Sequence, residues 1–199
     1  AALGLLIALS SPLFAGDVDA SKLSKKKQTP QGLYLSVKET YKMVNTEGTS
    51  LLFVDVRTPA EIEFVGAPQL IDVNIPYMLN DFSQWDDAKK RFKKVPNSNF
   101  TLAIEAALAA KGLGKDDRIV LMCRSGSRSA KAANLLHQAG YKNVYSVVEG
   151  FEGDSSKVAG AEGTRTVNGW KNAGLPYTYK HAASKMLSLI HISEPTRPY

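Results

Sequence analysis

Short runs of purely apolar residues alternate with amphipathic stretches along this chain of 199 residues. Residues 51–54 and 119–122 carry no polar side chain, and runs of this length are typical of strands that are buried on both faces. We predict a third strand at residues 144–148 and a short one at residues 71–75, which Pro76 ends. Strands of this kind, separated by helices, predict an α/β fold: a central parallel sheet with helices on both faces.

The stretches between the strands follow helical patterns. Ser36 and Thr58 each stand three residues before a glutamate, which is the capping-box arrangement of a helix start. Residues 81–94 are rich in charge and are predicted to form a helix that ends before Pro96. Two further helices are predicted from the spacing of apolar residues, at Leu102, Ala106 and Ala109 and at Ala132, Leu135, Leu136 and Ala139.

Both ends of the chain resemble segments that lie outside a folded domain. Residues 1–15 form an apolar run, interrupted by Pro12, that resembles the end of a secretory signal peptide rather than a membrane anchor. The protein is therefore predicted to be periplasmic or secreted, with no stable membrane span after processing. Residues 16–35 are predicted to be a polar linker, and residues 187–199 resemble translated sequencing-adapter DNA, a non-native tail. The folded domain is then residues 36–182.

Cys123 is the single cysteine and directly follows one of the predicted strands. One cysteine excludes an intramolecular disulfide and a cysteine-based zinc site, so it is either a small core residue or a nucleophile. Ligands of parallel sheets bind beyond the carboxyl ends of the strands, which is where this cysteine is expected. We predict neither a metal ion nor an organic cofactor.

The loop after this strand has the composition of an anion-binding site. It consists of Cys123, Arg124, Ser125, Gly126, Ser127, Arg128 and Ser129. Gly126 permits backbone dihedrals that let the loop curl around the sulfur atom with its N–H groups pointing inward. The start of the following helix and the two arginines add positive charge, and each of these features stabilises a thiolate over a thiol. The loop therefore predicts a nucleophilic cysteine, since an inert core cysteine would have apolar neighbours.

Three segments together resemble the successive signatures of the rhodanese family: residues 52–61, the cysteine loop at residues 123–129, and residues 169–176. They occur in the family's order. The resemblance implies the rhodanese-like fold and a thiosulfate sulfurtransferase of the exported bacterial type. In such an enzyme Cys123 attacks the sulfane sulfur of a small anionic donor such as thiosulfate, becomes a persulfide, and passes the sulfur to a thiol, cyanide or a protein.

Other residues of these motifs are predicted to surround the cysteine loop. Three that follow the strand at residues 144–148 are expected at the pocket edge: Glu149, Gly150 and Phe151. Four are predicted to be structural: Asp55, Arg57, Glu61 and Trp170. Arg57 and Glu61 are expected to form an ion pair. Residues 152–169 read either as a mobile surface insertion or as a lid or docking loop.

Other functions are weighed against this one. The net charge is +6, but the basic residues are dispersed except at residues 25–27, so no nucleic-acid partner is predicted. A cysteine-dependent phosphatase is a less favoured alternative, because those enzymes place five residues between cysteine and arginine and only four lie between Cys123 and Arg128. A sulfur carrier or binding module that works between proteins, with little free turnover, remains an alternative.

Overall fold

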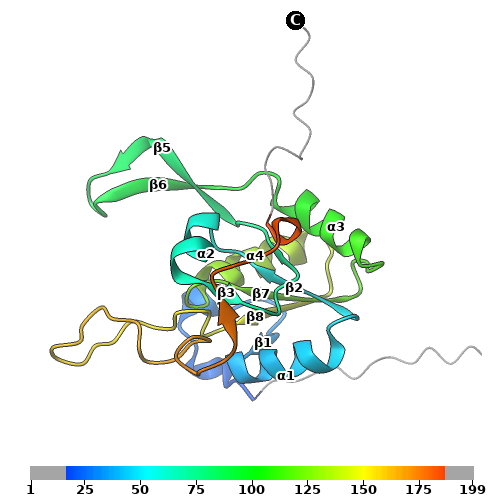
Figure 1. The fold of residues 1–199 in the computed structure, drawn as a ribbon, viewed down its shortest axis with the longest axis horizontal. Coiled ribbons are helices and arrows are strands. Elements are labelled where there is room, and N and C mark those ends of the chain that lie inside the picture. The colour runs from blue at the N-terminus through cyan, green and yellow to red at the C-terminus, as the bar shows by residue number, and fades with distance from the viewer. Residues whose placement is uncertain (1–16, 187–199) are drawn as a thin grey trace, which may run out of the picture.

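The computed structural model describes residues 17–186. Its main sheet has five strands in the order β1-β8-β7-β2-β4, and every neighbouring pair is parallel (Figure 1). The strands are β1 (Tyr34–Leu35), β2 (Leu51–Asp55), β4 (Val73–Asn74), β7 (Arg118–Met122) and β8 (Asn143–Val147). The predicted central parallel sheet is therefore confirmed. β2, β4, β7 and β8 lie at the predicted places, and β1 was not predicted.

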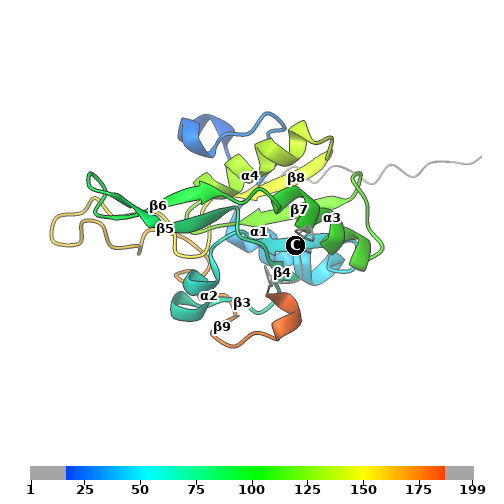
Figure 2. The ribbon, with the colours of Figure 1, turned by 90° about the horizontal axis from the view of Figure 1, so that it is seen from above.

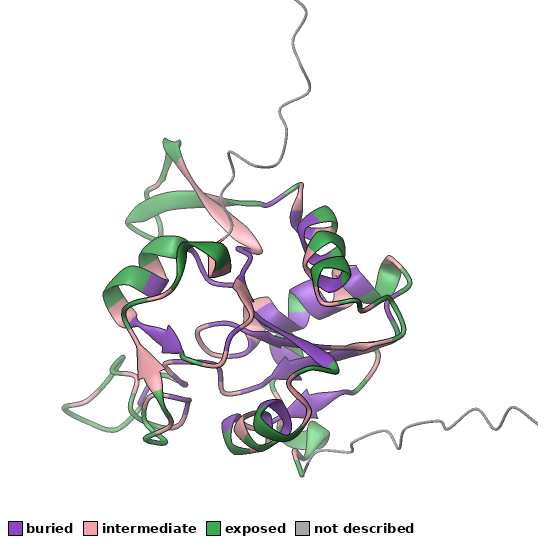
Figure 3. Ribbon diagram, turned by 45° about the vertical axis from the view of Figure 1, so that its right-hand side comes forward, coloured by how far each residue is buried: buried purple, intermediate pink, exposed green. Residues whose placement is uncertain are grey.

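Helices cover both faces of this sheet, as predicted. They are α1 (Val37–Glu47), α2 (Pro59–Val65), α3 (Phe100–Ala110) and α4 (Ser127–Gln138). Successive residues of β2 point to opposite faces: Phe53 packs in the cluster that contains Met43 of α1 and Ile62 of α2, and Val54 packs in the cluster of α3 and α4. Figure 2 shows α4 on one side of the sheet and α2 on the other, and Figure 3 shows the buried strands between them.

Both predicted capping boxes are present. Ser36 accepts a hydrogen bond from the N–H of Glu39, whose carboxylate accepts one in return from the N–H of Ser36, and α1 begins there. Thr58 and Glu61 do the same at the start of α2, with Pro59 as the first helical residue. These local patterns fix the two helix starts next to the sheet.

The predicted helix at residues 81–94 is wrong. The segment belongs to an antiparallel hairpin, β5 (Met78–Asp86) and β6 (Arg91–Pro96), which projects from the domain in Figure 1. Trp85 lies opposite Phe92, and the ring centroids of these two residues are 5.2 Å apart. Such cross-strand aromatic pairs stabilise a hairpin. A register shift between Asp81 and Trp85 interrupts the two-residue alternation that would have identified the strand.

α3 occurs where a helix was predicted, but it buries a different face. Leu102 is 62% exposed, and the buried residues are Phe100, Ala103, Ile104 and Leu108. This helix is apolar on nearly all sides, so the spacing of its alanines and leucines does not select one face. The position of the sheet decides which face of α3 is buried.

The segment predicted as a polar linker packs on the domain instead. Tyr34 and Leu35 form an edge strand of the sheet and are buried. The η2 turn (Lys25–Lys27) contacts α4, and the Lys27 ammonium group donates to the Asp154 carboxylate at 2.8 Å. The remaining short elements are η1 (Ala20–Lys22), the antiparallel pair β3 (Ala67–Pro68) and β9 (Tyr177–Thr178), and η3 (Ala183–Lys185).

The predicted leader at residues 1–15 and the predicted tail at residues 187–199 lie outside the described residues, and both stay predictions. Within residues 17–186, no helix combines the length and the apolar character needed to cross a membrane.

Candidate active site

The two central strands of the sheet bring the predicted site together. β2 and β7 are neighbours, and the chain continues from β2 to β4 on one side and from β7 to β8 on the other. Ligands bind at such a switch in strand order, beyond the carboxyl ends of the strands. Asp55, the last residue of β2, lies opposite Met122, the last residue of β7. Cys123 is the next residue along the chain, so it lies at this edge of the sheet.

The cysteine loop curls around the sulfur atom as the sequence indicated. Gly126 has φ 92° and is the N-cap of α4, and its N–H donates to the Cys123 Sγ at 3.2 Å. The sulfur atom therefore lies at the positive end of α4. Cys123 is only 1% exposed, so the loop encloses the atom that is predicted to react.

Two buried hydroxyl groups form a chain of polar contacts that ends at the Cys123 sulfur atom. The Ser129 Oγ lies 3.6 Å from the Cys123 Sγ, and the Ser146 hydroxyl donates to the Ser129 Oγ at 3.0 Å. Ser146 lies within β8 and was not predicted, because a serine inside a strand gives no sequence signal for a site. The pair of serines holds a polar contact to the sulfur atom inside the core.

Residues 149–151, which were predicted at the pocket edge, lie against the cysteine loop. The N–H of Phe151 donates to the carbonyl oxygen of Cys123 at 2.8 Å, and the Phe151 side chain is fully buried. A Cβ on Gly150 would lie 2.5 Å from backbone atoms of the loop. The Glu149 carboxylate accepts from the N–H of Val37 at 2.9 Å, and Glu149 lines a separate hollow of about 620 Å³ together with Ser125.

The predicted ion pair between Arg57 and Glu61 is wrong. Arg57 is fully buried and pairs with Asp55, with a distance of 2.7 Å between its Nη2 and the carboxylate. The same nitrogen donates to the carbonyl oxygen of Gly66, and the guanidinium stacks on the Phe151 ring at 4.3 Å. Because Arg57 turns inward at the end of β2, Glu61 is left for another partner.

That partner is Arg128 of the cysteine loop. The Arg128 guanidinium donates from both terminal nitrogens to the two carboxylate oxygens of Glu61, one of them at 2.7 Å. Burial would raise the pKa of Glu61, but the hydrogen bonds and charge of Arg128 lower it to about 2. Burial alone would lower the pKa of Arg128, but the hydrogen bonds and the charge of Glu61 outweigh burial and raise it. One of the two loop arginines is thus largely compensated.

Arg124 has no such partner among residues 17–186. It is half-buried, and burial together with the charges of Arg165 and Arg128 lowers its pKa. An incoming anion would stabilise the charge of a cation that is half-buried and has no ion-pair partner.

Trp170 is structural, as predicted. It is fully buried, its ring packs against Tyr41 and Phe53, and its indole N–H donates to the Pro176 carbonyl oxygen.

The Glu61–Arg128 pair predicts a pH-dependent stability. Glu61→Gln should lower the free energy of unfolding by about 2–3 kcal/mol at neutral pH, because it leaves a mostly buried guanidinium unpaired. A carboxylate with a lowered pKa stabilises above its unfolded pKa and loses this effect as pH falls toward 2, so the difference from the original protein should close there. Urea unfolding at several pH values measures it. Glu63→Gln, on the exposed side of α2, is the control, and an equal loss in both variants would contradict the prediction.

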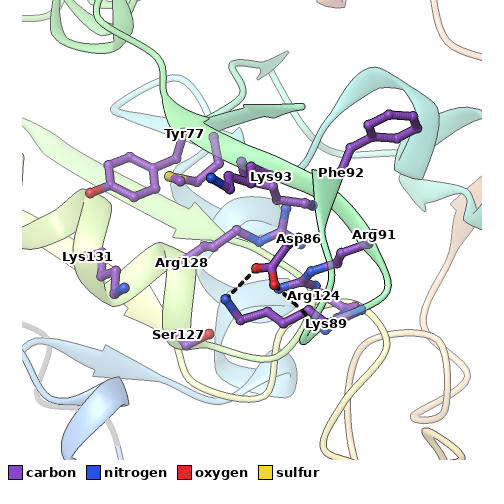
Figure 4. A pocket seen from close by; sticks show the side chains of 12 residues that line it. Tyr77, Asp86, Lys89, Arg91, Phe92, Lys93, Arg124, Ser127, Arg128 and Lys131 are labelled. Carbon is purple, nitrogen blue, oxygen red and sulfur yellow. Dashed lines mark hydrogen bonds and ion pairs between the residues drawn. The ribbon is translucent and has the colours of Figure 1, made fainter. Parts of the chain in front are cut away.

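A pocket of about 460 Å³ opens beside the loop, between the hairpin and α4 (Figure 4). It is lined by Tyr77, Met78, Asp86, Lys89, Arg91, Phe92, Lys93, Lys94, Arg124, Ser127, Arg128 and Lys131. Sequence reasoning placed Arg124, Ser127 and Arg128 here but missed the residues from 77 to 94. Five of the six residues at 89–94 are basic, so the expectation that basic residues are dispersed outside residues 25–27 is wrong for this segment. This cluster was a usable signal for the pocket.

Comparisons with known proteins agree with this geometry. Residues 36–157 match the model of the rhodanese-like domain. The uncharacterized protein RP600 of Rickettsia prowazekii is 31% identical over 141 residues, which cover 71% of this chain and 93% of that protein. Thiosulfate sulfurtransferase 18 of Arabidopsis thaliana is 34% identical over 99 residues, 50% of this chain and 62% of that protein.

Among solved structures, Rv0390 from M. tuberculosis superposes with a TM-score of 0.53 at 28% identity, and the match covers 74% of this chain and 97% of that one. The domain match spans more than half of the chain and includes the cysteine loop together with the strands that hold it. The chain belongs to the rhodanese-like domain family.

Proposed function

We propose that the protein is a sulfurtransferase that takes the sulfane sulfur of thiosulfate onto Cys123 as a persulfide and passes it to an acceptor. Family membership supports a sulfurtransferase type of activity. The observation that carries the proposal is the Cys123 Sγ at the start of α4, where it accepts the Gly126 N–H at 3.2 Å. The name of the distant Arabidopsis relative supports thiosulfate as the donor.

The loop provides what this reaction requires. The Cys123 thiolate attacks the outer sulfur of thiosulfate, a new sulfur–sulfur bond forms, and the bond within thiosulfate breaks. Sulfite leaves with the electron pair of that bond, so no oxidant or reductant is consumed. Donor and leaving group are both anions, and the half-buried, unpaired Arg124 stabilises them at both stages.

Mass spectrometry of the purified protein after incubation with thiosulfate tests the proposal. We expect Cys123 to gain about 32 Da, the mass of one sulfur atom, and to lose it when cyanide is added. A loaded protein that discharges only to another protein would favour the carrier alternative. Absence of any adduct would contradict the sulfurtransferase proposal.

The two arginines of the loop should have separable roles. Arg124→Ala removes an unpaired cation next to the donor, so we expect the thiosulfate KM to rise roughly ten- to hundredfold with little change in stability. Arg128→Ala leaves the mostly buried Glu61 carboxylate without its partner, so it should lower both kcat and the Tm. Steady-state kinetics and thermal unfolding of the two variants measure this. Lys42→Ala, on an exposed face of α1, is the charge control, and equal losses of Tm would show that the roles are not divided.

A further inference from the structure

The pocket between the hairpin and α4 collects positive charge from two separate parts of the chain. Lys89, Arg91, Lys93 and Lys94 line it from the hairpin. Arg124, Arg128 and Lys131 approach from the cysteine loop and α4 (Figure 4). Asp86 is the one acidic residue in this lining.

Several of these cations lack a compensating charge. Lys89 pairs with Asp86 at 2.8 Å, and Arg128 pairs with Glu61. Among the cations that line the pocket, those that form no ion pair with another of residues 17–186 are Arg91, Lys93, Lys94, Arg124 and Lys131. Lys94 and Arg124 are half-buried. Burial lowers the pKa of each and nearby arginines lower it further, and this outweighs the opposite effect of Glu61. Like charges are thus held close together, and a bound anion would relieve their repulsion.

The pocket is also larger than a sulfur anion requires. Its volume of about 460 Å³ is typical of small-molecule sites, which range over ~300–1,000 Å³. Thiosulfate has only a few heavy atoms, and a single water molecule occupies ~30 Å³. Tyr77 and Met78 add apolar surface to the wall. The remaining space suits an organic ligand that carries more than one negative charge at one end.

We propose that this pocket binds the sulfur acceptor, and that the acceptor is a thiol that carries a phosphate group. The inference rests on the sulfurtransferase function proposed above. A phosphate monoester carries nearly two negative charges at neutral pH, and guanidinium groups bind it through two parallel hydrogen bonds. Arg124 and Arg128 belong to both the pocket and the cysteine loop, so an acceptor held here lies beside the loop that contains Cys123.

The transfer step balances without a further reactant. The acceptor thiolate attacks the outer sulfur of the Cys123 persulfide and forms a new sulfur–sulfur bond. The bond between that sulfur and Sγ breaks, and its electron pair returns to Cys123 as a thiolate. The acceptor leaves as a persulfide, so one sulfane sulfur is moved and no net oxidation occurs.

The test separates loading of the protein from discharge. The protein is first loaded with thiosulfate and freed of excess donor, and the gain of about 32 Da is checked. Loss of this mass is then followed with 4′-phosphopantetheine and with pantetheine, which has the same thiol arm and no phosphate. We expect a KM about tenfold lower for the phosphorylated thiol. Arg91→Gln and Lys131→Gln should each reduce that ratio by about threefold, and Lys42→Gln on α1 should leave it unchanged.

Three results would overturn the inference: equal KM values for the two thiols, a ratio that neither pocket variant changes, or inorganic phosphate binding as tightly as phosphopantetheine. Failure of the loading step would instead contradict the proposed function. The pocket is then tested without sulfur chemistry, by calorimetric binding of the S-methyl forms of both thiols to the Cys123→Ser protein. Preference for the phosphorylated form supports the pocket in that case, and equal affinity contradicts it.

Discussion

A Cys123→Ser variant is expected to lose persulfide formation and thiosulfate:cyanide transfer completely while its fold is retained. The hydroxyl group is far too weak an acid to be ionised at this site, and it is a much poorer nucleophile than a thiolate. The side chain becomes only slightly smaller, and a serine hydroxyl can accept the Gly126 N–H and contact Ser129 as the sulfur does. Activity should therefore fall by at least about a thousandfold with a change in stability below about 1 kcal/mol.

Mass spectrometry with thiosulfate and urea unfolding measure both expectations on one preparation. Ser155→Ala, at an exposed position of the insertion that follows the loop, serves as the control and should behave as the original protein does. Transfer by the serine variant above a few per cent of the original rate would contradict the proposed mechanism. An unfolded variant would show that the thiol also has a structural role that the small change in volume does not predict.

A Gly126→Ala variant is expected to lose both activity and stability, because the alanine would have a strained backbone conformation and would clash with a neighbouring carbonyl oxygen. Gly126 has φ 92°, where an alanine is strained. In addition, its Cβ would lie 2.2 Å from the carbonyl oxygen of Val148, so the loop has to move. Movement removes the N–H from the Cys123 Sγ. We expect a loss of about 2–4 kcal/mol in stability and a fall of more than about a hundredfold in persulfide formation.

Gly140→Ala provides a closely matched control. Gly140 has φ 88°, nearly the same backbone conformation, and a Cβ there would have no neighbouring atom within 4 Å. This variant should lose about 1 kcal/mol from backbone strain alone and keep full activity. Equal stability losses in the two variants, measured by urea unfolding, would show that the contact with Val148 is relieved at little cost. Rapid persulfide formation by Gly126→Ala would show that the curled loop is not required.

The hairpin shows why part of the site was not predictable. A helix was expected at residues 81–94 because the segment is charged and lacks a regular two-residue alternation. Its structure instead depends on contacts between residues on opposite strands, such as Trp85 and Phe92, and on the irregularity after Asp81. Pairing of this kind forms only when the chain reverses, so a local pattern does not reveal it. Because the hairpin was not predicted, the basic pocket between the hairpin and α4 was not predicted either.

The sequence by itself determined the layered architecture, the start of α1 and α2, and the place of Cys123 at the end of a strand. These features follow from neighbouring residues: buried strands lack polar side chains, capping boxes act over one turn, and Cys123 directly follows a strand. Tertiary structure alone decided which charges meet, as Arg128 meets Glu61 from 67 positions away. It also decided that Ser146 supports the sulfur atom and that Lys27 lies against the cysteine loop. The physical reason is that an ion pair or a buried hydroxyl contact depends on where the backbone brings distant segments together, and residue type alone does not fix that position.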